Sequence, residues 1–169
     1  IGMEMAQAHI RMGVKVTVIE GDKALSKDDP ELAAIVLQTL KDEGVEIAEG
    51  AQAAEIRGDI GAIEVEAKDG RVFKGSHLLV AVGRKANTDR LDLDKAGIEP
   101  IKNGIKVDDS LRTTNRKVYA IGDVAGGMQF THVAGYHGGV VIRSLMFALP
   151  AKAKTAHIPW ATYTDPELS

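Results

Sequence analysis

The stretch VYAIGDVAGGMQFTHVAGYHGG, residues 118–139, decides how this chain folds. It begins with the apolar run Val118–Ile121, which is long enough for a buried strand, and continues into Gly122-Asp123 and a glycine-rich turn. A segment with helical spacing opens at Thr131. This order places a carboxylate and free backbone N–H groups at the carboxyl end of a strand, where open α/β sheets bind nucleotides. Gly-Asp taken alone also fits an ordinary tight connection, with glycine at positive φ and aspartate as a helix cap.

The first twenty residues have the pattern of the rear half of a βαβ dinucleotide-binding unit. Residues 1–12 predict a helix that ends at Gly13, and the alternating valines of residues 14–19 predict a strand that ends at Glu20. Glu20 follows Gly2 by 18 residues, close to the ~20 that separate the glycine fingerprint from the ribose-binding acid. Gly2 then takes the place of the third glycine of G-x-G-x-x-G. From these residues alone, a packing glycine and a solvated strand-end acid fit equally well.

Further elements follow from local signals. Asp29 and Pro30 predict the cap and first turn of a helix that Gly44 closes. Asp-Gly and other glycine-containing turns between short alternating runs predict a β-meander, and residues 77–82 (HLLVAV) predict a buried strand. The remaining expected elements are a strand at 45–47, meander strands at 53–56, 62–67 and 71–73, a short helix and loop at 91–106, and a helix at 131–149 that Pro150 ends.

Composition excludes several classes of function. Of 169 residues, 44% are apolar and 27% charged, so the chain can bury a core, and a net charge of −3 argues against a dedicated nucleic-acid surface. With no cysteine, these residues form no disulfide, thiolate nucleophile or cysteine-ligated zinc site, and a reduced cytoplasm is the default expectation. No apolar run approaches the ~20 residues of a membrane span. The five histidines have no metal-ligand spacing, so we expect no metal.

Five motifs in order make the chain resemble the pyridine nucleotide–disulfide oxidoreductases, in particular dihydrolipoamide dehydrogenases and mercuric reductases. The motifs are Ile1-Gly2-Met3-Glu4, the acid Glu20, Val82-Gly83-Arg84, Ala120-Ile121-Gly122-Asp123 and Tyr163-Thr164-Asp165-Pro166. The family usually has proline where this chain has Ala86. The resemblance implies an internal fragment of α/β class. It comprises a Rossmann-like NAD(H)-binding domain with an inserted β-meander (1–114), the last part of an FAD-binding domain (115–150), and a linker with the first strand of a dimerisation domain (151–169).

The resemblance also implies which residues bind the cofactors, FAD and NAD. On the nicotinamide side these are Gly2, Glu4 near the nicotinamide–flavin contact, Glu20 on the ribose, Ala53 and Gly83. On the flavin side they are Gly122, Asp123 on a ribityl hydroxyl, and Gln129, Phe130, Thr131 and His132 at the N1/O2 edge of the ring. An acid at Glu20, with no arginine among the next six residues, favours NAD(H) over NADP(H). Arg84 is expected to bond within its loop or form a structural ion pair.

The implied activity is hydride transfer from NADH through flavin to a disulfide-type acceptor, in a homodimer formed by the dimerisation domain. We expect no catalytic residue in this chain, because the cysteine pair and the family's His–Glu pair are not in it. Two alternatives stay open: a non-catalytic nucleotide-binding or dimer-forming fragment, and a flavoenzyme that uses a quinone or oxygen. Because no strand precedes the first helix, we also expect a gap, an exposed apolar patch or a strand borrowed from another chain there.

Overall fold

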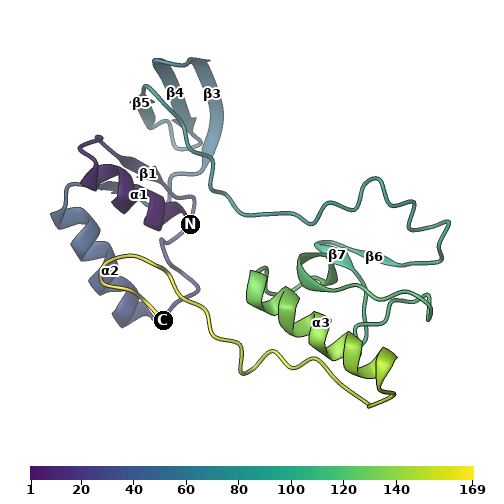
Figure 1. Ribbon diagram of the computed structural model, residues 1–169. Helices are drawn as coiled ribbons and strands as arrows, with labels where there is room; N and C mark the ends of the chain where they lie inside the picture. Colours follow the sequence, from purple (N-terminus) through teal and green to yellow (C-terminus); the bar gives the residue numbers. More distant parts are fainter. The chain divides into compact units, whose positions relative to one another are not determined.

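The computed structural model describes residues 1–169 throughout, and they divide into two units (Figure 1). Unit 1 consists of Ile1–Val82 together with Pro159–Ser169, and unit 2 consists of Gly83–Ile158. Residues 83–114, which the sequence groups with the nucleotide-binding part, thus cluster with the residues that follow them. No helix of the chain combines the length and the apolar character that crossing a bilayer requires.

Unit 1 is built on two helices and a small parallel sheet. Helix α1 (Gly2–Arg11) is followed by strand β1 (Thr17–Ile19), and helix α2 (Pro30–Asp42) by strand β2 (Glu46–Ala48). Strands β1 and β2 pair in parallel, as a βαβ unit requires. Both helices lie where the sequence predicts them, whereas β1 is shorter than the predicted run of residues 14–19.

Local capping explains the limits of the two helices. The Asp29 carboxylate accepts hydrogen bonds from the backbone N–H groups of Glu31 and Leu32, at 2.9 and 3.3 Å, and Pro30 occupies the first helical position. These interactions satisfy donors that a helix start otherwise leaves unpaired. At the other ends, Gly13 and Gly44 adopt φ angles of +83° and +100°, which side-chain-bearing residues rarely adopt.

The core of unit 1 joins both helices to the end of the chain. Met3 and Ala6 of α1 pack in one cluster with Val36 and Leu40 of α2, and Leu168 completes it. Leu40 is fully buried and Val36 is 2% exposed. The C-terminal segment 159–169 is therefore packed on unit 1, where it forms one antiparallel bridge between Thr162 and Leu168. It contains no strand, contrary to the first strand of a dimerisation domain expected within residues 151–169.

The β-meander is confirmed. Strands β3 (Ala53–Asp59), β4 (Ala62–Ala67) and β5 (Val72–Gly75) form an antiparallel sheet in sequential order. The prediction of a buried strand at residues 77–82 is wrong: the segment forms no strand, and Leu79, Val80 and Val82 are 58, 65 and 92% exposed. A strand needs a hydrogen-bonding neighbour, and no strand of this chain pairs with the segment.

Unit 2 packs a hairpin and one long helix around a turn. Strands β6 (Pro100–Ile101) and β7 (Gly104–Ile105) form the hairpin, a 3₁₀ turn spans Gly122–Ala125, and helix α3 covers Thr131–Met146. Two predictions are wrong. Residues 91–106 contain turns and the hairpin instead of a helix, and Val118–Ile121 forms a single bridge, Arg112–Tyr119, instead of a strand. Ala120 is nevertheless buried, so the segment is part of the core of unit 2.

Candidate functional site

The Gly122-Asp123 turn is fixed to α3 at two points. Gly122 has φ +67°, and a Cβ added there would lie 2.9 Å from the Cβ of Ala134. The Gly122 N–H donates to the Nδ1 atom of His137 at 3.2 Å, and His137 is 5% exposed. Burial lowers the pKa of His137, which keeps the imidazole neutral and able to accept at Nδ1. The backbone therefore enters the turn in one conformation.

Asp123 points its carboxylate toward a neighbouring arginine without being buried by it. The Arg84 guanidinium lies 3.8 Å from the Asp123 carboxylate, and the two side chains are 53 and 47% exposed. Arg84 also donates to the backbone carbonyl of Gln129. It thus joins its own loop to both ends of the glycine-rich turn, and of the two roles expected for Arg84 the ion pair is the one that the structure shows. An ion pair this long and exposed leaves the Asp123 carboxylate able to accept further hydrogen bonds.

Helix α3 starts next to this turn without a side-chain cap. Phe130 is the N-cap residue, and the first helical bond runs from the Ala134 N–H to the Phe130 carbonyl at 3.1 Å. The rings of Phe130 and His132 stack at 5.3 Å with an angle of 9°. An uncapped helix start presents N–H groups and the positive end of the helix dipole. Gln129, Phe130, Thr131 and His132 therefore lie together at a position suited to an anionic group.

Glu20 lies directly after β1, at the carboxyl end of the parallel sheet. It is half-buried, forms no ion pair, and accepts one hydrogen bond, from the Asp22 N–H to Oε1 at 3.0 Å. Its backbone carbonyl accepts from the Ala51 N–H at 2.8 Å, which places the loop before Ala53 beside it. The Oε2 atom accepts no hydrogen bond within the chain and remains available for a ligand.

Glu4 belongs to a different set of contacts. Glu4, Gln7 and Arg11 lie along one face of α1 and hold the C-terminal segment. Glu4 accepts from the Tyr163 N–H at 2.8 Å, and the Gln7 amide both accepts from the N–H and donates to the carbonyl of Asp165, at 2.8 Å each. Arg11 forms ion pairs with the Asp165 and Glu43 carboxylates. We name this set the α1 clamp.

The α1 clamp affects the ionisation of its members. Burial raises the pKa of Glu4, whereas the hydrogen bond from the Tyr163 N–H lowers it. The hydrogen bond from Arg11 lowers the pKa of Glu43. Both carboxylates are therefore charged at neutral pH, and Glu4 can act as an acceptor only.

The predicted glycines differ in their surroundings. A Cβ added to Gly2 would lie 3.6 Å from the Cβ of Ala81, so Gly2 allows α1 to approach the 77–82 segment. Gly83 has φ +106° but nothing within 4 Å of an added Cβ. It serves the conformation of its loop, with open space beside it. The structure thus gathers the residues expected on the flavin side at one turn. It disperses those expected on the nicotinamide side over α1, the end of β1, the start of β3 and the loop at Gly83.

Two residues of these sites were missed from the sequence. His137 was considered only as a metal ligand, although its place on the face of α3 with Val133 and Val140, all buried, indicates a buried polar group that needs a partner. Gln7 is 4% exposed on the buried face of α1, and the same argument applies. Their partners are distant in sequence, so local patterns could show the need for a contact but not its identity.

Comparisons with known proteins agree with this geometry. Residues 1–138 match the family model described as pyridine nucleotide-disulphide oxidoreductase. The chain is 37% identical to a mercuric reductase of Lysinibacillus sphaericus, over 100% of this chain and 32% of the relative. It is 36% identical to a dihydrolipoyl dehydrogenase of Geobacillus stearothermophilus, over 99% and 36%. The chain thus spans about a third of the length of these curated relatives.

Solved structures give the same result. The crystal structure of LpdA from Mycobacterium tuberculosis matches with a TM-score of 0.90 and 27% identity, covering 98% of this chain and 36% of that one. A Cu(II) complex of the HOCl-induced flavoprotein disulfide reductase RclA from Escherichia coli matches with a TM-score of 0.89 and 28% identity, covering 98% and 39%. A family match over most of the chain, joined to the glycine turn, the strand-end acid and the uncapped helix start, shows that this chain belongs to the pyridine nucleotide–disulphide oxidoreductases.

Proposed function

We propose that this chain supplies the NAD(H)-binding surface and the flavin-facing turn of an oxidoreductase that passes hydride from NADH through FAD to a disulfide-type acceptor. The observation that carries the proposal is the uncapped start of α3 beside the Gly122-Asp123 turn. When bound, the flavin and nicotinamide supply the hydride chemistry, and the protein's part is to bind and orient them. Dimerisation through a further domain remains a prediction of the family resemblance.

On the flavin side, the residues present suit the group that the family binds. The Asp123 carboxylate is about half exposed and can accept from a sugar hydroxyl while the long contact to Arg84 persists. The N–H groups at the start of α3 can donate to an oxygen or nitrogen that carries negative charge. A preorganised donor and dipole of this kind stabilises charge that develops during reaction. His137 and Ala134 hold the turn that aims these groups.

On the nicotinamide side, Glu20 supports NAD(H) as the substrate. Its free carboxylate oxygen can accept from ribose hydroxyls, and its negative charge repels the 2′-phosphate of NADP(H). No arginine stands among residues 21–26 to neutralise that phosphate. Glu4 is the second acid expected on the nicotinamide side, and the Tyr163 N–H already orients its carboxylate. The position of the Glu4 side chain therefore depends on the C-terminal segment.

The proposal is tested by titrating the chain with NADH and NADPH and following nucleotide fluorescence. We expect NADH to bind more tightly, and Glu20→Gln to weaken NADH binding roughly tenfold, since hydrogen bonds to a charged group are lost. Glu46→Gln is the matched control, because Glu46 is exposed and contacts only Thr17 Oγ1. Preference for NADPH, or equal losses in both variants, would refute the role of Glu20.

A parallel titration with FAD tests the flavin side. Asp123→Asn should weaken FAD binding, whereas Asp109→Asn, an exposed acid whose only side-chain contact is to Lys152, should not. If the chain binds neither nucleotide, it is a non-catalytic fragment, and the assignment of both sites to this part of the protein is wrong.

A further inference from the structure

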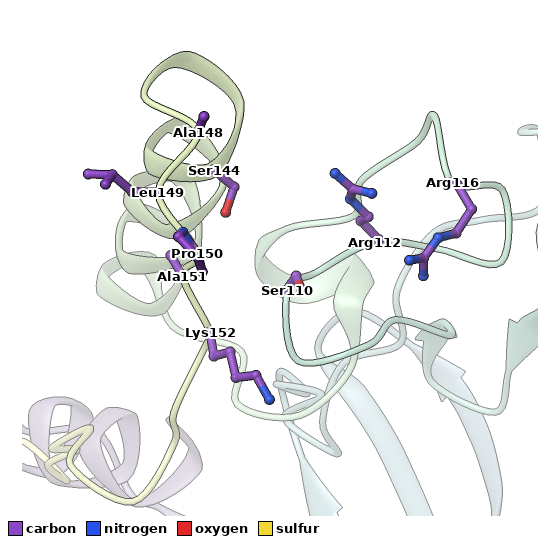
Figure 2. A pocket seen from close by; sticks show the side chains of 9 residues that line it. All are labelled: Ser110, Arg112, Arg116, Ser144, Ala148, Leu149, Pro150, Ala151 and Lys152. Carbon is purple, nitrogen blue, oxygen red and sulfur yellow. The ribbon is translucent and has the colours of Figure 1, made fainter.

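A hollow of about 270 Å³ opens in unit 2 between the 110–116 loop and the end of α3 (Figure 2). None of the residues that line it is among those expected to bind FAD or NAD. We propose that this hollow is a binding site for a small ligand that carries a phosphate group, held by Arg112, Arg116 and Lys152. The proposal is independent of the proposed function.

Positive charge is concentrated at this hollow. Its lining includes Arg112, Arg116 and Lys152 and no acidic residue. Figure 2 shows the two arginines on the loop and the lysine beyond the end of the facing helix. Two acids stand behind them: Asp108 lies 3.2 Å from Arg116, and Asp109 lies 3.3 Å from Lys152. Both ion pairs are exposed and contribute little, although the Ser110 and Arg112 N–H groups also hold the Asp108 carboxylate in place. The cations exceed the acids by one.

Arg112 is the cation without an acidic partner. Its Nε atom donates to the Tyr119 hydroxyl at 2.6 Å, and its guanidinium carbon lies 5.2 Å from the centre of the Tyr119 ring. These contacts hold the half-buried side chain in place by its inner edge and leave both terminal nitrogens unpaired. A guanidinium fixed in this way loses little conformational freedom when a ligand binds. It offers a bidentate pair of donors to an oxyanion.

The remaining lining suits a phosphate ester in size and polarity. Ser144 presents a hydroxyl on the helix side, and the chain segment of Leu149 and Pro150 borders the hollow beyond the helix end. The Leu149 N–H donates to the Arg143 carbonyl at 3.2 Å. This carbonyl at the end of the helix is therefore paired, and it presents no free acceptor to an anionic ligand. The Arg112 guanidinium can donate to two oxygens of a phosphate, with Arg116 and Lys152 on the same lining. The volume exceeds that of the phosphate group and leaves room for a small organic part.

The hollow lies at the far ends of the two segments that form the flavin-side turn. Segment 118–121 leads from the Arg112–Tyr119 bridge to Gly122, and α3 leads from Thr131 back to Ser144. A ligand that contacts both Arg112 and the end of α3 therefore joins the two segments on the side opposite to the turn. This position separates the site from the one proposed for FAD within the same unit.

The test is a titration of the ¹⁵N-labelled chain at constant ionic strength and pH, followed by amide NMR. The probes are inorganic phosphate, ribose 5-phosphate, ribose and chloride. We expect saturable shifts with both phosphates, centred on residues 110–116 and 144–152, and none with ribose or chloride. Tighter binding of ribose 5-phosphate than of phosphate identifies an ester as the ligand, and equal binding identifies the free ion. Identical shifts with chloride and phosphate would show mere ionic screening and overturn the proposal.

Matched variants assign the binding to these side chains. Arg112→Met should weaken phosphate binding roughly tenfold, because charge-assisted hydrogen bonds are lost. Lys152→Met, at an exposed position, should weaken it by a smaller factor without affecting the fold, which guards against a misfolded Arg112 variant. Arg90→Met is the control, since Arg90 is exposed in the same unit and forms no ion pair. Equal effects of Arg90→Met and Lys152→Met would overturn the assignment.

Discussion

The backbone N–H of Gly122 donates to the Nδ1 atom of His137, 3.2 Å away in the interior of unit 2. A neutral imidazole carries its proton on Nε2 when Nδ1 accepts, so this contact fixes both the tautomer and the ring orientation. Through it, α3 determines the conformation of the turn that presents Asp123. The turn is therefore a tertiary feature, in which a buried side chain satisfies a backbone donor that no strand neighbour takes up.

His137→Phe should destabilise the chain by about 1–3 kcal/mol, because the buried Gly122 N–H is left without an acceptor while the volume of the ring is retained. The free energy of unfolding, measured by urea denaturation, checks this. His77→Phe is the matched control, since His77 is exposed and bonds only to its neighbour Ser76. Comparable losses in the two variants would show that the hydrogen bond to Gly122 contributes nothing.

The stability of the chain should fall as the pH drops below about 6.5, the unperturbed pKa of histidine. Burial lowers the pKa of His137 in the folded state, so between that lowered value and 6.5 the unfolded chain binds more protons than the folded chain. The contribution of His137 to stability then decreases with falling pH through this interval and levels off below it. Urea denaturation at several pH values should show the decrease in wild type and a smaller one in His137→Phe. If stability falls equally with pH in the wild-type chain and in His137→Phe, His137 is not the source of the decrease.

The α1 clamp should hold the C-terminal segment in place on unit 1. Gln7→Leu removes both hydrogen bonds to Asp165, and we expect the segment to loosen at a cost of about 1–3 kcal/mol. Trp160, the only tryptophan, reports this, because its indole N–H contacts Asp28 at 3.3 Å. Its fluorescence should become more accessible to acrylamide.

The control for the clamp is Gln38→Leu, which makes the same change on α2, where Gln38 is exposed and bonds only to Asp42. Its acrylamide quenching should equal that of the wild-type chain. If Gln7→Leu also leaves the quenching unchanged, the C-terminal segment is held by its apolar contacts alone, through Leu168.

Local signals predicted the parts of the fold that depend on neighbours in sequence. Asp29, Pro30 and Gly44 set the limits of α2, and Asp69-Gly70 marks the turn between β4 and β5. These predictions are correct because capping and turn conformation depend on only a few neighbouring residues. The apolar periodicity predicted a helix over residues 131–149, and the structure ends α3 earlier, at Met146.

The failures concern contacts that a local pattern does not contain. Residues 77–82 and 118–121 are apolar enough for strands, but a strand forms only where a second strand offers hydrogen bonds, and neither segment has one here. For the sites, the turn glycine, its acid and the start of α3 were found from motif spacing. His137 and Gln7 were not, because each matters through a partner elsewhere in the fold.

Gly122 and Gly127 offer a matched test of the packing between the turn and α3. Both have positive φ, +67° and +79°, so alanine at either position should cost about 1 kcal/mol in backbone strain. Only at Gly122 would the new Cβ also meet Ala134, at 2.9 Å, whereas nothing lies within 4 Å at Gly127. Gly122→Ala should therefore cost an additional 1–3 kcal/mol, roughly the penalty of overpacking. Combining it with Ala134→Gly should recover part of that excess in thermal denaturation. Equal losses of stability for Gly122→Ala and Gly127→Ala would show that α3 shifts to accommodate the new Cβ at no cost.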